Sequence, residues 1–163
     1  MKRLVVAAAM TLGLAAVAVP RGMQAQSRNI PRVAFSTADF AKLKWLAGDW
    51  AGTAVGEKPL YERIAFVDDS TAEFTYYRDA GFTEQSGTGR LYLSVGRVYH
   101  TFGANRWAAT RVDENGIYFI PQTSAHNNFE WTRLSPDEWR STMRTGISGH
   151  QQVVVYNMKR VPR

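Results

Sequence analysis

The chain has no cysteine among its 163 residues, and this absence excludes several kinds of chemistry. Without thiols the protein can form no disulfide, use no thiolate nucleophile and hold no zinc or iron–sulfur centre through sulfur. The G-x-S-x-G motif of serine hydrolases is also missing. The three histidines, His100, His126 and His150, are spaced too widely for a local metal motif. The sequence therefore predicts no catalytic residue and no metal site.

A concentrated basic surface is the second missing feature. The chain carries 20 basic and 14 acidic residues, a formal net charge of +6. Lys2, Arg3 and Arg21 belong to the N-terminal segment, and without these three only 17 basic residues remain. They are scattered singly, whereas a nucleic-acid surface needs a stripe or cluster of positive charge. We expect no nucleic-acid partner.

The N-terminal segment has the pattern of a signal peptide. Lys2 and Arg3 precede the uncharged apolar run 4–19, and Met23-Gln24-Ala25 offers a cleavage site. A second possible cleavage site is the segment 16–18, Ala-Val-Ala. The apolar run is shorter than the ~20 residues that a membrane-spanning helix requires. The sequence thus predicts a signal peptide over 1–25, no stable membrane insertion after cleavage, and a single periplasmic or secreted domain over 26–163.

The domain begins with the pattern of one short helix. Ser36 can act as the N-cap, and Asp39 in the first turn complements the helix dipole. Phe40, Leu43 and Leu46 recur at helical spacing, and Gly48 can end the helix. We predict a helix over 37–46.

After Gly48 the pattern changes to alternation with a period of two, interrupted by turn signals. Many short strands joined by hairpin-length turns favour an up-and-down meander, and a long meander closes to avoid unpaired edges. The sequence predicts an all-β, antiparallel, up-and-down barrel of about ten strands, preceded by the helix. The expected strands are 49–55, 60–67, 72–79, 85–95, 97–103, 107–113, 116–121, 129–135, 138–145 and 151–159.

The chain is rich in aromatic residues, with five tryptophans, seven tyrosines and eight phenylalanines. We expect Trp50, at the start of the first strand, to close the base of the barrel. Elsewhere the aromatic residues could line a ligand pocket, or they could simply fill the core, since aromatics are common in strands. Alternation defines two faces on each strand but does not say which one faces inward. The candidate ligand-binding residues are Tyr76, Arg90, Tyr92, His100, Trp107, Tyr118, Trp131 and Tyr156.

Both ends of the predicted domain resemble a known group of barrels. The segment 40–52, FAKLKWLAGDWAG, resembles the opening of calycin-type barrels, most of all the nitrobindin-like group and related uncharacterised bacterial lipocalin-like domains. The segment 153–160, VVVYNMKR, is similar to their last strand. The resemblance implies a ten-stranded barrel preceded by a short helix. It is specific for architecture more than for function, because one fold hosts many functions.

The resemblance also implies a possible cofactor. Nitrobindins hold a ferric haem through a histidine on the last strand, and the candidate here is His150, which lies farther from Tyr156 than in the family. An Arg-x-Tyr carboxylate clamp, as in fatty-acid-binding relatives, is absent because Val154 precedes Tyr156 by two positions.

Three functional hypotheses follow. The first is an exported barrel without a cofactor that holds a small apolar molecule. The second is a nitrobindin-like haem protein that acts on nitrogen oxides or peroxynitrite. The third is a non-catalytic interaction domain of the cell envelope.

Overall fold

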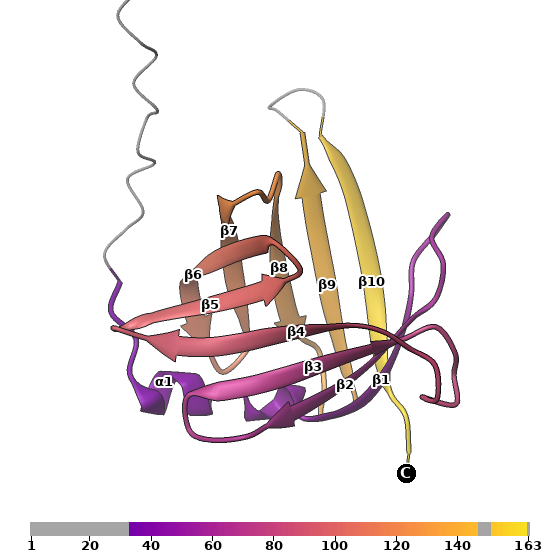
Figure 1. Ribbon diagram of the computed structural model, residues 1–163, viewed down its shortest axis with the longest axis horizontal. Helices are drawn as coiled ribbons and strands as arrows, with labels where there is room; N and C mark the ends of the chain where they lie inside the picture. Colours follow the sequence, from indigo (N-terminus) through magenta and orange to yellow (C-terminus); the bar gives the residue numbers. More distant parts are fainter. Residues whose placement is uncertain (1–32, 147–150, 163) are drawn as a thin grey trace, which may run out of the picture.

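The computed structural model describes residues 33–146 and 151–162, so the predicted signal peptide lies outside the described residues. Ten antiparallel strands form a closed barrel in which each strand pairs with its neighbours in sequence and β1 pairs with β10 (Figure 1). The fold is therefore the predicted all-β, up-and-down barrel, and it is consistent with a calycin-like architecture. The strands are β1 (Gly48–Thr53), β2 (Leu60–Phe66), β3 (Thr71–Tyr77), β4 (Gln85–Ser94), β5 (Arg97–Phe102), β6 (Asn105–Asp113), β7 (Gly116–Thr123), β8 (Asn127–Arg133), β9 (Glu138–Thr145) and β10 (Gln152–Arg160).

The helical segment before the barrel differs from the prediction of one continuous helix. It consists of a short α-helix, α1 (Thr37–Ala41), and a 3₁₀ turn, η1 (Lys44–Leu46). The Leu43 N–H bonds to the Phe40 carbonyl three residues back, which tightens the chain at this point. The break leaves Phe40, Leu43 and Leu46 all fully buried. Packing against the barrel, and not the 3.6-residue period of the apolar residues, thus determines the backbone conformation of this segment.

The helical segment closes one end of the barrel. Ser36 and Asp39 form a capping box that starts α1, with the Asp39 N–H donating to the Ser36 hydroxyl at 3.2 Å. At the other end of the segment, the Trp50 indole N–H donates to the Leu46 carbonyl at 2.7 Å. Trp50 is fully buried and packs edge-on against Trp139. The prediction that Trp50 seals the base of the barrel is confirmed.

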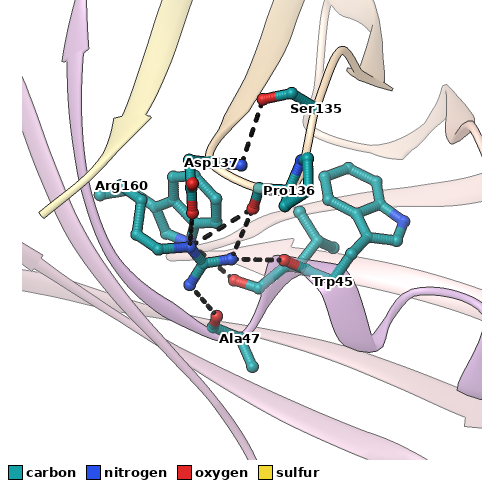
Figure 2. Close-up of polar contacts among 8 residues, drawn as sticks. Trp45, Ala47, Ser135, Pro136, Asp137 and Arg160 are labelled. Carbon is teal, nitrogen blue, oxygen red and sulfur yellow. Dashed lines mark hydrogen bonds and ion pairs between the residues drawn. The ribbon is translucent and has the colours of Figure 1, made fainter. Parts of the chain in front are cut away.

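Arg160, near the end of β10, ties the closed end together (Figure 2). Its guanidinium donates to the carbonyls of Ala47, Trp45 and Pro136 at 2.8, 3.3 and 3.0 Å, and to the Asp137 carboxylate at 3.0 Å. The same group lies 4.2 Å from the centroid of the Trp50 ring. Gly48 has a φ of +136°, and a Cβ there would collide with this guanidinium. One charged side chain thus joins η1, the β8–β9 turn and the last strand.

The strands alternate between an inner and an outer face, with register shifts at Tyr76/Tyr77 on β3 and at two places on β6. On β3, Phe74 is fully buried whereas its neighbour Glu73 is exposed. On β4, Gly89 lies on the inner face, where a Cβ would approach the Thr101 carbonyl oxygen to 2.8 Å. This glycine lets the aromatic rings of the interior lie close to the strand. None of the helices in the described residues is long and apolar enough to span a membrane.

Candidate functional site

The barrel interior contains a cavity of about 400 Å³ in the half away from the helical segment. Because the strands are antiparallel and β1 starts at the closed end, β2, β6 and β8 start at the opposite end. Their first residues Leu60, Asn105 and Asn127 line the cavity and so mark its mouth. The remaining lining residues are Glu62, Tyr76, His100, Phe102, Trp107, Phe129, Trp131, Trp139, Ser141, Met143 and Tyr156.

The walls of the cavity are mainly aromatic. Trp131 lies 5.7 Å from Trp139 and 5.5 Å from Phe129, measured between ring centroids. Trp107 is held by its indole N–H, which donates to the Asn127 carbonyl at 2.9 Å. Rings fixed in this way form a rigid apolar surface, and the volume is near the lower end of the range of small-molecule pockets, which is about 300–1,000 Å³. The cavity can therefore take a small apolar or aromatic body.

Glu62 on β2 supplies the acidic group of the cavity. Its side chain is buried, with 3% of the residue exposed, and no protein group donates a hydrogen bond to its Oε1 atom. In register it lies opposite Trp50 on β1 and Tyr76 on β3. Burial raises the pKa of Glu62 from 4.5 to about 8, because the charged carboxylate loses water and gains no counter-charge. Burial, and after it the nearby Glu62 charge, raise the pKa of Tyr76.

His100 on β5 is the second buried titratable group. The rings of Phe74, Trp107, Phe119, Phe129 and Trp131 surround it at centroid distances of 5.3, 5.7, 5.9, 5.8 and 5.1 Å. Its Nδ1 atom has no hydrogen-bond partner. Burial lowers the pKa of His100 from 6.5 to about 3, so the imidazole is neutral at physiological pH.

Three residues that line the cavity each carry a buried polar atom without a partner within the protein: Glu62 Oε1, His100 Nδ1 and Trp139 Nε1. A buried polar atom without a partner costs about 1–3 kcal/mol, and folded proteins keep few of them. Because all three residues belong to one small cavity, this part of the interior is the candidate binding site.

Five of the eight candidate residues from the sequence line this cavity. They are Tyr76, His100, Trp107, Trp131 and Tyr156. They come from four different parts of the meander, β3, β5–β6, β8 and β10, and barrel closure brings them together.

The other three candidates, Arg90, Tyr92 and Tyr118, lie on the outer face, which corrects the expectation that they face the interior. Arg90 pairs with the exposed Glu73 at 3.2 Å, and Tyr92 packs against Tyr99. Tyr118 lies between the buried Ile117 and Phe119 on β7 and so points outward. On β4 the physical reason is that the inner face carries Gly89 and Leu91, so the alternate residues Arg90 and Tyr92 lie on the outer face.

Glu62 was not among the candidate residues predicted from the sequence. Its inward position was nevertheless indicated there, because it interrupts an otherwise apolar alternation on one face of β2, formed by Leu60, Ile64 and Phe66. An acidic residue at an inward position deserves notice, because carboxylates are almost never buried without a partner.

The proposed haem ligand His150 lies outside the described residues. Within residues 33–146 and 151–162, no group of three or more histidine, aspartate or glutamate side chains could hold a metal ion.

A larger hollow of about 770 Å³ lies over the outer faces of β3, β4 and β5. Its charged groups Glu73 and Arg90 already pair with each other, and none of the unpartnered buried atoms lies there. The interior cavity is therefore the stronger candidate site despite its smaller volume.

In comparisons with known proteins, no family model and no curated protein matches the chain.

Proposed function

We propose that this protein is an exported barrel that binds a small, largely apolar molecule in its interior. The observation that carries the proposal is the aromatic cavity of about 400 Å³, which is lined by Glu62, His100 and Trp139, each with an unpartnered buried polar atom. A barrel that served only as a packed structural core would gain stability by filling this space and by pairing or removing these groups.

The proposal can be tested with N-phenyl-1-naphthylamine, an uncharged apolar dye whose fluorescence rises in apolar surroundings. The purified domain 26–163 is expected to bind one dye molecule. Ser141→Phe, which fills the cavity wall from β9, should abolish binding. Thr142→Phe places the same ring on the outer face of the same strand and should leave binding unchanged.

Far-ultraviolet circular dichroism establishes that both variants fold, and Met143→Trp replaces Ser141→Phe if that variant does not. Dye binding that is equal in the filled and control variants, or absent in the wild type, would contradict the proposal. Stable capture of an envelope protein by such a wild type would favour the interaction-domain hypothesis.

The nitrobindin-like alternative rests on the resemblance of segments 40–52 and 153–160 and on His150. Haem added to the same protein tests it directly. A Soret band that is lost in His150→Ala would favour a haem protein, whereas no Soret band would contradict it.

A further inference from the structure

Glu62 also bears on the charge of the molecule that fits the cavity, provided that the proposed binding function holds. The residue is 3% exposed, its Oε1 atom has no donor, and it is one of the residues that line the cavity. Among the described residues, no lysine or arginine lines this cavity. An anionic ligand would therefore meet an acidic group and no positive charge, which disfavours fatty acids and other carboxylates.

The aromatic walls favour the opposite charge. The faces of tryptophan and tyrosine rings attract cations within about 6 Å of the ring centroid, and the attraction reaches about 2 kcal/mol in sites without water. Tyr76 lies beside Glu62 on the adjacent strand, and Trp131, Trp139 and Tyr156 line the same cavity. A carboxyl beside several aromatic rings is the combination that recognises an ammonium group.

We propose that the cavity binds a small organic amine in its cationic form, with the ammonium group paired to Glu62 and the apolar body held between the aromatic rings. The ammonium supplies the hydrogen bonds and the counter-charge that the carboxyl lacks within the protein. The volume of about 400 Å³ limits the body to one or two rings or a short chain.

The titratable neighbours leave Glu62 as the group that changes charge on binding. Burial raises the pKa values of Tyr76 on β3 and Tyr156 on β10 and lowers that of His100 on β5, so all three are neutral at pH 7.5. Glu62, whose pKa is about 8, is mostly protonated at that pH and must lose its proton to pair with an ammonium. Amine binding should therefore release a proton, which calorimetry in buffers of different ionisation enthalpy measures.

Three probes with one ring system separate the charge of the ligand from its shape. They are 1-naphthylmethylamine, 1-naphthylmethanol and 1-naphthoate, which are cationic, neutral and anionic at pH 7.5. We expect the amine to bind the wild type at least about tenfold more tightly than the alcohol, and the carboxylate to bind most weakly. In Glu62→Gln the amine and the alcohol should bind within about threefold of each other.

Glu73→Gln is the matched control, because Glu73 is an exposed carboxylate on the outer face of the neighbouring strand. It should keep the full preference for the amine. The order of the three probes on the wild type needs no variant, so the test stands even if Glu62→Gln folds poorly.

The outcomes separate the two proposals. If the alcohol binds as tightly as the amine, or if the preference survives in Glu62→Gln, the amine inference is wrong while the binding function stands. If none of the three probes nor the dye binds, the binding function itself fails.

Discussion

The two ends of the barrel differ in how completely a charged side chain is hydrogen-bonded. At the closed end, all three guanidinium nitrogens of Arg160 donate to backbone carbonyls or to Asp137 (Figure 2). In the open half, Glu62 is buried deeper and has an oxygen without a donor. The closed end uses its charge to hold chain segments together, although the indole N–H of Trp45 there is unpartnered. The open half bears an electrostatic cost that a bound molecule can relieve.

The largest expected effect comes from breaking the closed end. Arg160→Met should lower the free energy of unfolding by roughly 3–4 kcal/mol, because it removes several charge-assisted hydrogen bonds and leaves the carbonyls of Trp45 and Ala47 unpaired. Urea unfolding measures the loss. Lys159→Met, on the adjacent exposed residue, should change stability by less than about 0.5 kcal/mol. Equal losses in the two variants would show that Arg160 does not hold the closed end.

Glu62 should give the next largest effect, and it depends on pH. Since its pKa is about 8 in the folded protein and near 4.5 when exposed, its contribution is fully present below pH 4.5 and is lost as the pH rises through 8. Glu62→Gln should therefore be more stable than the wild type by about 3 kcal/mol at pH 7, and by much less at pH 4.5. Urea unfolding at both pH values tests this. A constant difference across the range would mean that Glu62 is not desolvated.

His100 should act in the opposite direction at acid pH. Its pKa is depressed to about 3, so its contribution is present above pH 6.5 and is lost as the pH falls toward 3. His100→Phe keeps an aromatic ring among the five that surround the site and removes the titration. The variant should be about 3 kcal/mol more stable than the wild type at pH 4, relative to their difference at pH 7. Thermal unfolding at the two pH values measures this, and an unchanged difference would contradict it.

The smallest effect should come from the outer face. Arg90 and Glu73 form an exposed ion pair, so Arg90→Ala should cost no more than about 0.5 kcal/mol. Because Arg90 lies outside the cavity, dye binding should not change. A large loss of dye binding in Arg90→Ala would mean that the outer hollow, and not the interior, is the ligand site.

The strand pattern could be predicted from the sequence because turns and period-two alternation are local properties. Each predicted strand overlaps an observed one, and Trp50 lies where its motif placed it. The helix was less predictable, since its break at Lys42 and Leu43 serves to bury Leu43 and Leu46 against a barrel assembled from distant residues.

The cavity was only partly predictable, as β3 and β4 illustrate. Tyr76 and Arg90 both lie on alternating strands with a polar and an apolar face, yet the first points inward and the second outward. Alternation fixes which residues share a face, but the direction of that face depends on the strands that pair on both sides. The inward position of Glu62 was therefore visible only as an acidic residue within an apolar pattern.

The amino-acid sequence by itself determined the fold class, the number of strands and the aromatic character of the interior, because these follow from periodicity, turn residues and composition. Only the tertiary structure decided which residues meet inside the barrel and which polar atoms lack partners. Closure brings together side chains from β2, β5 and β9, which are far apart in sequence, and removes water from Glu62 and His100. Desolvation depends on everything that surrounds a group, so it cannot be inferred from the residues that adjoin it in the chain.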